Sequence, residues 1–243
     1  MSAGSRRAQE LARQQALAAA KRHRERRIGV VAALVVLVLL VGGGIGFQAW
    51  RTRRAPDAVP TSGAASLAPV AITDGKPIVL GQADAPVKLA LYEDFHCPHC
   101  AEFEEAYGSV LTAARESGKA EIELYPMSFI DAGSESAANA MACAAEAGFG
   151  ASYYEGLFAN ATLRWSDGQL IALADQVAPG DTERFNSCVR SRAHAGWAAS
   201  IDAAADANGV SSTPTLFLDG ARLDLANLTP EALQTKIDEA ATT

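Results

Sequence analysis

Two cysteines separated by two residues are the feature of the sequence best suited to chemistry. Cys97 and Cys100 lie in the stretch EDFHCPHCAEFEE, residues 93–105, with Pro98 and His99 between them. Such a CxxC pair can exchange disulfides with other thiols, form half of a tetrahedral zinc site, or close a structural bridge. The rest of the sequence has to distinguish these three kinds of chemistry.

The pair is well placed for thiol–disulfide exchange if a helix begins between the two cysteines. Pro98 suits the first helical position, where no backbone N–H is needed, so Cys97 would cap the helix. The unpaired N–H groups and the dipole at a helix start favour the thiolate form of Cys97, and His99 can add to this effect. Cys100 would lie one turn further on, within reach of Cys97. Because a stabilised thiolate makes the disulfide a stronger oxidant, the Pro–His dipeptide favours a donor of disulfides.

The zinc site and the structural bridge have less support from the sequence. A structural zinc site needs two further ligands. The sequence has no second CxxC motif, and His194 is the only histidine that follows Cys100. A bridge between Cys97 and Cys100 closes so short a loop that it would contribute little through chain entropy. We therefore expect no bound metal. A metal-binding or non-catalytic exported module is the weaker alternative.

Residues 28–50 are predicted to anchor the chain in a membrane. The run IGVVAALVVLVLLVGGGIGF, residues 28–47, is uncharged and about as long as a helix that crosses a bilayer. The preceding leader, residues 1–27, is basic, which predicts a single-pass protein with a cytoplasmic N-terminus and an extracytoplasmic catalytic domain. A cleaved signal peptide is the alternative, although its apolar region would be shorter. The leader is more typical of a segment that meets anionic lipid than of one that binds nucleic acid.

The remainder of the chain is predicted to be a linker and one acidic domain. Residues 51–69 are rich in Pro, Ala, Ser and Gly, which is typical of a tether, and the domain spans residues 70–243. Residues 1–54 hold 11 of the 21 Lys and Arg but only 2 of the 28 Asp and Glu, which leaves 10 basic and 26 acidic residues, a net charge of −16, for the rest. A domain this acidic is a poor binder of nucleic acid.

The domain alternates between strand and helix patterns. We expect strands at 86–95, 120–129, 213–220 and 221–225, a helix from Pro98 that stops at Gly118, Ala-rich helices over about 132–208, and a last helix near Pro230. Residues 70–81 are predicted to form an edge hairpin with a turn at Asp74–Gly75. A sheet flanked by helices, with an inserted helical subdomain, fits this order.

Three features together resemble the DsbA family of thioredoxin-fold disulfide oxidoreductases, in particular the membrane-anchored envelope members of Gram-positive bacteria and actinobacteria. They are the CxxC motif at a strand-to-helix junction, the helical insertion, and the segment GVSSTPTLFLDG at 209–220. The resemblance covers residues 70–243 and implies an α/β thioredoxin fold with an inserted helical subdomain, preceded here by one transmembrane helix. It also implies a cis peptide bond before Pro214, with the backbone of Thr213 facing a bound peptide. A trans proline that begins an edge strand is the alternative.

The same resemblance implies a protein thiol–disulfide oxidoreductase that needs no cofactor. We expect an oxidase whose substrates are exported proteins that contain cysteines. A DsbB-like or vitamin K epoxide reductase-like membrane enzyme would reoxidise it. A reductase or an isomerase on the same fold is the alternative.

One departure from the family concerns proton transfer. Many relatives have a buried Glu six residues before the first cysteine, where this sequence has Leu91. Glu93 and Asp94 lie closer to the motif, and either of them could accept the proton of Cys100. The alternative is that both are plain surface acids at the end of a strand.

Two further cysteines, Cys143 and Cys188, lie in helical stretches near the ends of the insertion. If Cys97 pairs with Cys100, these two remain, and an oxidising compartment would preserve a bridge between them. Closing that loop could stabilise the protein by up to roughly 4 kcal/mol. Some envelope relatives carry a second, structural bridge, which favours this pairing. Two free buried cysteines are the alternative.

Overall fold

The computed structural model describes residues 69–242 with the exception of residues 162, 163, 179 and 181. The leader 1–27, the anchor 28–50 and the linker up to residue 68 lie outside the described residues, so what the sequence predicts for them stays a prediction. Within the described part of the chain, no helix is both long enough and apolar enough to cross a membrane.

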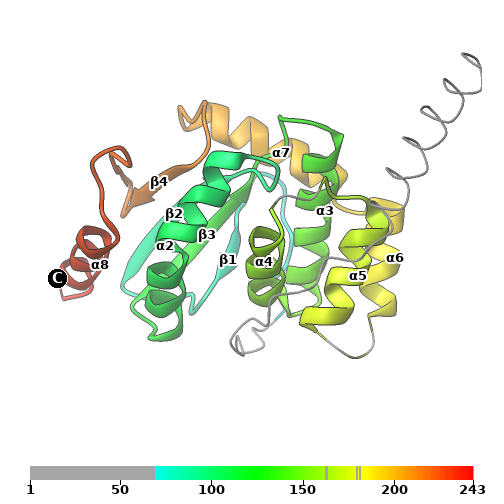
Figure 1. The fold of residues 1–243 in the computed structure, drawn as a ribbon, viewed down its shortest axis with the longest axis horizontal. Coiled ribbons are helices and arrows are strands. Elements are labelled where there is room, and N and C mark those ends of the chain that lie inside the picture. Colours follow the sequence, from blue (N-terminus) through cyan, green and yellow to red (C-terminus); the bar gives the residue numbers. More distant parts are fainter. Residues whose placement is uncertain (1–68, 162–163, 179, 181, 243) are drawn as a thin grey trace, which may run out of the picture. The chain divides into compact units, whose positions relative to one another are not determined.

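A sheet of five strands forms the centre of the described domain (Figure 1). The strands are β1 (Ile78–Leu80), β2 (Val87–Glu93), β3 (Ala120–Pro126), β4 (Thr215–Leu218) and β5 (Ala221–Arg222). Their order across the sheet is β1-β3-β2-β4-β5, and only β2 and β3 run parallel. The hairpin predicted for 70–81 is wrong, because this segment contributes only the edge strand β1, which pairs with β3 and not with the residues before its own turn.

Helix α2 (Pro98–Glu116) follows β2 directly and carries the CxxC motif. Cys97 is its N-cap, with an extended backbone, and Pro98 lies in its first turn. One face of the helix is apolar and buried; its members include Phe103, Leu111 and Ala114. The helix ends before Gly118, whose φ of 70° lies in the left-handed region that glycine tolerates. Burial of the apolar face holds the start of the helix, and with it both cysteines, against the end of β2.

The remaining helices comprise one insertion and one C-terminal helix. They are α3 (Ala132–Glu146), α4 (Gly150–Ala159), α5 (Asp167–Val177), α6 (Glu183–Ser191), α7 (Ala195–Ala207) and α8 (Pro230–Ala240). The Ala-rich helix α3 is buried almost all round, because α4, α5, α6 and α7 all pack against it. Helix α8 lies beside α2. The predicted helical insertion between the third strand and the fourth is confirmed.

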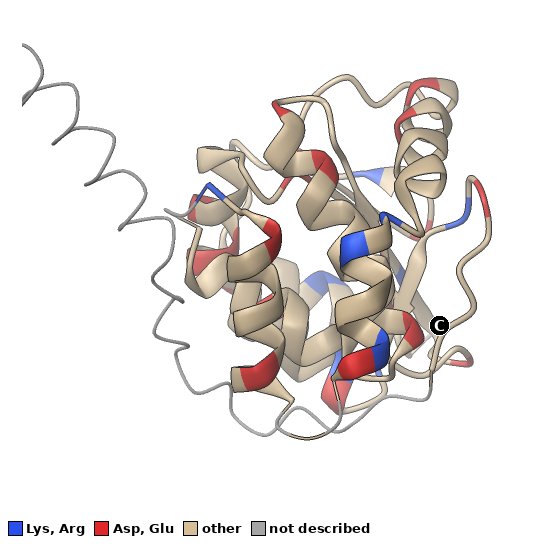
Figure 2. Cartoon of the chain, turned by 90° about the vertical axis from the view of Figure 1, so that its right-hand side faces the viewer, with Lys and Arg blue, Asp and Glu red and all other residues tan. Residues whose placement is uncertain are grey.

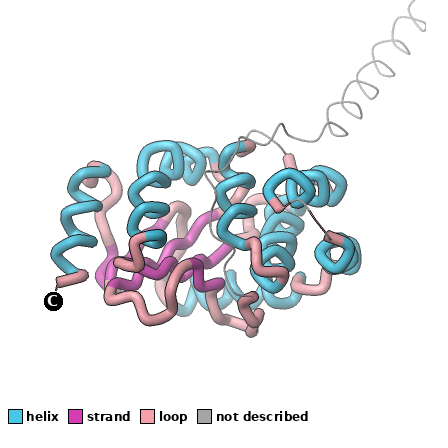
Figure 3. The backbone as a smooth tube through the Cα atoms, turned by 90° about the horizontal axis from the view of Figure 1, so that it is seen from below, coloured by secondary structure: helices cyan, strands magenta, loops and turns pink. Residues whose placement is uncertain are grey.

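Both faces of the sheet are covered by helices (Figure 3). Successive residues of a strand point to opposite faces. At the end of β2, Glu93 accepts a hydrogen bond from Tyr154 of α4 on one face, while the Tyr92 hydroxyl accepts one from Asn208, which follows α7, on the other. Acidic residues are spread over these helices (Figure 2), and residues 55–243 hold 26 acidic against 10 basic residues.

Candidate active site

The two cysteines of the CxxC motif are brought together by the turn from β2 into α2. The Cys97 N–H donates to the Asp94 carbonyl oxygen at 2.9 Å, and the Cys100 N–H donates to the Cys97 carbonyl oxygen at 3.1 Å. The two sulfur atoms are not bonded to each other. Cys97 keeps 8% of its surface exposed, whereas Cys100 has none. Cys97 is therefore the cysteine that another molecule can reach, and Cys100 lies behind it.

The segment before β4 forms the second side of this site. The Thr213–Pro214 peptide bond is cis, and the Thr213 carbonyl oxygen lies 3.7 Å from the Cys97 sulfur, which donates to it. Strand β4 pairs with β2, which sets Thr215 opposite Tyr92 and so places the proline beside the motif. An open groove of about 390 Å³ adjoins the proline; its lining residues are Pro214, Thr215, Arg222, Leu223, Asp224 and Leu225.

Cys100 is held in the thiol form by its surroundings. Its burial raises the pKa of the thiol, and the negative charges of Glu93 and Cys97 raise it further. Hydrogen bonds from the Asp94 backbone and the Thr213 side chain oppose the shift but are weaker. A cysteine in this environment needs a base to remove its proton before it can attack a neighbouring sulfur.

His99 lies on the exposed side of the motif. Its side chain is 78% exposed and its Nδ1 lies 3.1 Å from a carboxylate oxygen of Glu102, three residues further along α2. The hydrogen bonds found among the described residues do not include one from His99 to either sulfur. Its effect on the Cys97 thiolate stays a prediction.

Glu93 and Asp94 are buried, so the interpretation of the two as plain surface acids is wrong. Neither has any exposed surface. The Tyr154 hydroxyl donates to Glu93 Oε2 at 2.5 Å, while Glu93 Oε1 is buried without a hydrogen-bond partner. Burial raises the pKa of Glu93, and the charge of Glu104 raises it further. Of the two acids, Glu93 is the one whose charge acts on Cys100.

Asp94 instead organises the backbone of the loop that carries the motif. One carboxylate oxygen accepts hydrogen bonds from the His96 N–H and from the Ser134 hydroxyl, both at 2.8 Å. Burial raises the pKa of Asp94, although these bonds oppose the shift. Its contacts assign it a positioning role, because they tie the loop to the first turn of α3.

Glu104 and Tyr154 are site residues that sequence reasoning missed. Glu104 lies four residues after Cys100 and therefore on the same face of α2, which is the one signal that the sequence offered. Tyr154 comes from α4, and its hydroxyl interacts with both Glu93 and Glu104. Burial is the main cause that raises the pKa of Glu104 to about 7. The buried carboxyl group of Glu93, the partly buried one of Glu104 and a buried phenol thus lie behind the cysteines.

A second polar cluster joins the motif to the helical insertion. The His96 ring lies between Asp131, whose Oδ1 is 2.7 Å from its Nδ1, and the Trp165 N–H, which donates to its Nε2 at 3.2 Å. These partners assign the proton to Nδ1 of a neutral ring. Asp131 also caps α3 and pairs with Arg164. The cluster fixes the loop before Cys97 to the insertion from two directions.

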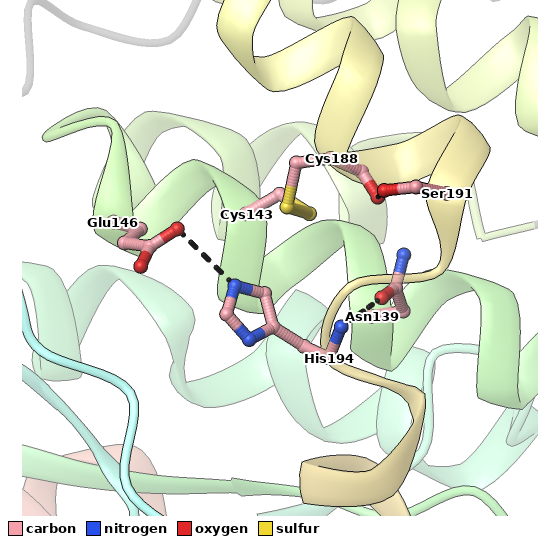
Figure 4. Close-up of a disulfide and its surroundings, with 6 residues drawn as sticks. All are labelled: Asn139, Cys143, Glu146, Cys188, Ser191 and His194. Carbon is pink, nitrogen blue, oxygen red and sulfur yellow. Dashed lines mark hydrogen bonds and ion pairs between the residues drawn. A yellow bond between two sulfur atoms is a disulfide. The ribbon is translucent and has the colours of Figure 1, made fainter.

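Cys143 and Cys188 form a disulfide that joins α3 to α6 (Figure 4). His194, at the start of α7, lies next to it and bonds Glu146 through Nε2 at 3.2 Å. In the described part of the chain these two cysteines and His194 are the group that could approach one metal ion together. Because both sulfurs are bonded to each other, they do not offer thiolate ligands in this state.

Comparison with known proteins places the chain in a family. A family model described as thioredoxin matches residues 73–239, which include the CxxC motif, the insertion and the proline loop. The chain belongs to this thioredoxin family.

Solved structures of thiol–disulfide oxidoreductases share the fold at low sequence identity. The MdbA protein of Actinomyces oris, a thiol-disulfide oxidoreductase, has a TM-score of 0.61 and 20% identity over 77% of this chain and 98% of its own. Reduced DsbA of Mycobacterium tuberculosis has a TM-score of 0.60 and 20% identity, over 69% of this chain and 93% of its own. The MdbA protein of Corynebacterium diphtheriae has a TM-score of 0.58 and 24% identity, over 76% of this chain and 96% of its own. The expected likeness to the DsbA family is confirmed for the fold.

One curated relative is of another kind. The Na(+)/H(+) antiporter NhaA 3 of Salinispora tropica is 33% identical over 148 residues, which are 59% of this chain and 22% of the antiporter. The chain thus spans about a fifth of the length of this relative.

Proposed function

We propose that the protein is a thiol–disulfide oxidoreductase that donates the Cys97–Cys100 disulfide to exported proteins. The observation that carries the proposal is the asymmetry of the pair. Cys97 is the accessible sulfur at the start of α2, beside the Thr213 carbonyl oxygen, whereas Cys100 is fully buried next to the acid Glu93. A two-step disulfide exchange requires one sulfur that a substrate thiolate can attack and a second sulfur that the substrate cannot reach.

The reaction balances with residues of the site alone. A substrate thiolate attacks the Cys97 sulfur, the bond between Cys97 and Cys100 breaks, and its electron pair leaves on Cys100. Cys100 takes a proton from Glu93, because both its burial and the nearby charge favour the thiol. A second substrate thiolate then attacks the substrate sulfur of the mixed disulfide, and Cys97 leaves as a thiolate. The substrate loses two electrons and the pair gains them.

The substrate would lie across Cys97 and the proline loop. In the thioredoxin fold seen here, the groove at Pro214 is open to solvent, and the Thr213 backbone lies next to the reacting sulfur. An extended segment with a cysteine fits this arrangement through backbone hydrogen bonds, which would make the enzyme tolerant of sequence.

The cellular setting is part of the same proposal. Residues 28–50 would hold the protein in the cell membrane as a single span, with the catalytic domain outside the cytoplasm. The disulfide between Cys143 and Cys188 supports this setting, since such bridges persist in oxidising compartments. A membrane enzyme of the DsbB or vitamin K epoxide reductase type would reoxidise the pair. A periplasmic-type reporter fused after residue 243 should be active, and activity of a cytoplasmic reporter there would contradict the orientation.

Cysteine variants test the chemistry. Cys97→Ser should abolish exchange with a reduced two-cysteine peptide, whereas Cys100→Ser should accumulate a mixed disulfide at Cys97, detectable by mass spectrometry after acid quenching. Cys97 should also be alkylated much faster than Cys100. Exchange that survives Cys97→Ser would refute the assignment. The equilibrium of the pair with glutathione then separates the alternatives: a strongly oxidising pair supports the oxidase, and a strongly reducing one assigns the reductase.

A further inference from the structure

The second disulfide lies in a cluster of polar side chains that three helices supply. Helix α3 carries Asn139, Cys143 and Glu146, whose spacing of four and three residues places them on one face of the helix. Helix α6 carries Cys188, and His194 is the N-cap residue of α7. The two sulfurs and one ring nitrogen of His194 all lie within 4.8 Å of one another (Figure 4).

His194 is held beside the sulfurs at two points. Its backbone N–H donates to Asn139 Oδ1 at 2.8 Å, and Asn139 is buried within α3. Its ring Nε2 lies 3.2 Å from Glu146 Oε2. A disulfide needs no imidazole beside it, so the bridge alone does not account for a histidine that is fixed in this way.

Reduction of the bridge would turn this cluster into a set of metal ligands. Two thiolates and one imidazole are ligands that Zn²⁺ prefers in tetrahedral sites. Thiolates at about 2.3 Å from one tetrahedral ion lie about 3.8 Å apart, whereas the bonded sulfurs of Cys143 and Cys188 are 2.05 Å apart. The two Cα atoms are 6.0 Å apart, so rotation of the side chains can open the pair without movement of the helices.

Glu146 is placed to complete the tetrahedron. The 3.2 Å between its Oε2 and His194 Nε2 is roughly the spacing of two ligand atoms that each lie about 2.0–2.2 Å from one tetrahedral ion. Among the ion pairs of the described residues, Glu146 pairs with His194 and with no Lys or Arg that would compete for it. Its side chain is 40% exposed and that of His194 is 15% exposed, so an ion can enter from solvent.

We propose that the dithiol form of Cys143 and Cys188 binds one Zn²⁺ ion together with His194, and that Glu146 supplies the fourth ligand. The proposal goes beyond the proposed function and does not depend on Cys97 or Cys100. Cysteines are thiols when a chain is made, and the cytosol keeps them reduced, so the metal-bound form precedes the bridge. The ion joins α3 to α6 in one state and the disulfide joins them in the other.

Exchange between the two states is a two-electron reaction. A disulfide oxidant, such as oxidised glutathione, takes two electrons from the metal-bound thiolates of Cys143 and Cys188. Their S–S bond forms, the S–S bond of the oxidant breaks to give two thiolates, and Zn²⁺ leaves to water. In the reverse direction a dithiol reductant becomes a disulfide, its two protons go to water, and the two freed thiolates bind Zn²⁺.

Zinc titration of a protein that has only this pair tests the site. The full-length Cys97→Ser/Cys100→Ser protein is reduced with dithiothreitol, freed of reductant without air, and titrated with Zn²⁺ against a chromophoric chelator. The reduced protein should take up one Zn²⁺ per chain, and the same protein with the bridge intact should take up none. Co²⁺ in place of Zn²⁺ should give a thiolate-to-metal charge-transfer band in the reduced protein alone.

Single substitutions in the same protein assign the other ligands. His194→Ala and Glu146→Gln should each weaken zinc binding at least about tenfold, since even partners of metal ligands contribute this much. Glu135→Gln is the matched control for Glu146→Gln, because Glu135 lies on the same helix with a similar exposure of 46% and contacts Arg192 instead. Its affinity for zinc should stay within about twofold of that of the parent protein, which is the scatter expected for an exposed acid away from the ion.

Alkylation of the wild-type protein gives a second readout that needs no variant. Zn²⁺ should slow the reaction of reduced Cys143 and Cys188 with iodoacetamide, located by mass spectrometry, and a chelator should restore the rate. A reduced protein that takes up no zinc, whether or not it stays folded, would overturn the proposal. An affinity that His194→Ala leaves unchanged would overturn it as well, because the two thiolates would then bind the ion without the cluster around them.

Discussion

Replacing Glu104 by Gln should make the protein more stable at neutral and alkaline pH. The pKa of Glu104 is raised from its usual 4.5 to about 7, chiefly by burial. The folded state therefore binds more protons than the unfolded state between these two values, and stability falls as the pH rises through that window. A shift of this size corresponds to a loss of about 3 kcal/mol once the pH exceeds 7. Gln keeps the shape and cannot ionise, so Glu104→Gln should recover up to that amount.

Urea unfolding at a series of pH values measures this difference. The two proteins should have similar free energies of unfolding near pH 4.5, and the difference should grow in favour of Glu104→Gln until about pH 8. Glu105→Gln is the control, because the neighbouring Glu105 is exposed on the same helix and its replacement should leave the free energy nearly constant. A Glu104→Gln protein that is never more stable than the wild type over this range would refute the argument that ionisation of Glu104 destabilises the folded protein.

Two further changes test the surroundings of the site. A Cβ atom at Gly133 would lie 2.1 Å from the His96 ring. Gly133→Ala should therefore lower the free energy of unfolding by about 1–3 kcal/mol and slow disulfide exchange at the motif. Gly168→Ala is the control, because Gly168 has open space around it, and this change should be neutral or slightly stabilising. Replacing Cys143 and Cys188 together by Ser should lower the free energy of unfolding by up to about 4 kcal/mol, given their separation of 45 residues; free thiols at both positions in the native protein, seen by mass spectrometry, would contradict the bridge.

Local sequence patterns predicted most of the framework. Proline after Cys97 and the apolar periodicity that follows indicated where α2 begins, and the structure has that start. The apolar runs at 86–95 and 120–129 contain β2 and β3. The hairpin at 70–81 failed because a turn at Asp74–Gly75 does not specify which strand the next segment joins. Strand β1 pairs with β3 instead, a contact between segments more than forty residues apart.

The environment of the acids could not be read from their neighbours in sequence. A Glu at the end of a strand is usually exposed, and nothing near Glu93 shows that α4 will cover it. Tyr154 is separated from Glu93 by 61 positions, so its contact depends on how the insertion packs on α2. The i, i+4 spacing of Cys100 and Glu104 predicts that both lie on one face of the helix. It does not predict that Glu104 lies near a second acid.

Burial of the acids also bears on the proposed transfer of a proton between Glu93 and Cys100. A carboxylate with an ordinary pKa of about 4.3 would be a weak base for any cysteine, whose ordinary pKa is about 8.5. Burial raises the pKa of Cys100 and by itself would make the mismatch worse. The same burial, and the repulsion from Glu104, raise the pKa of Glu93 as well, which brings base and thiol closer together and lowers the barrier to transfer. Since the Tyr154 hydroxyl of α4 donates to Glu93, the helical insertion shapes the surroundings of this acid and does not only cover the sheet.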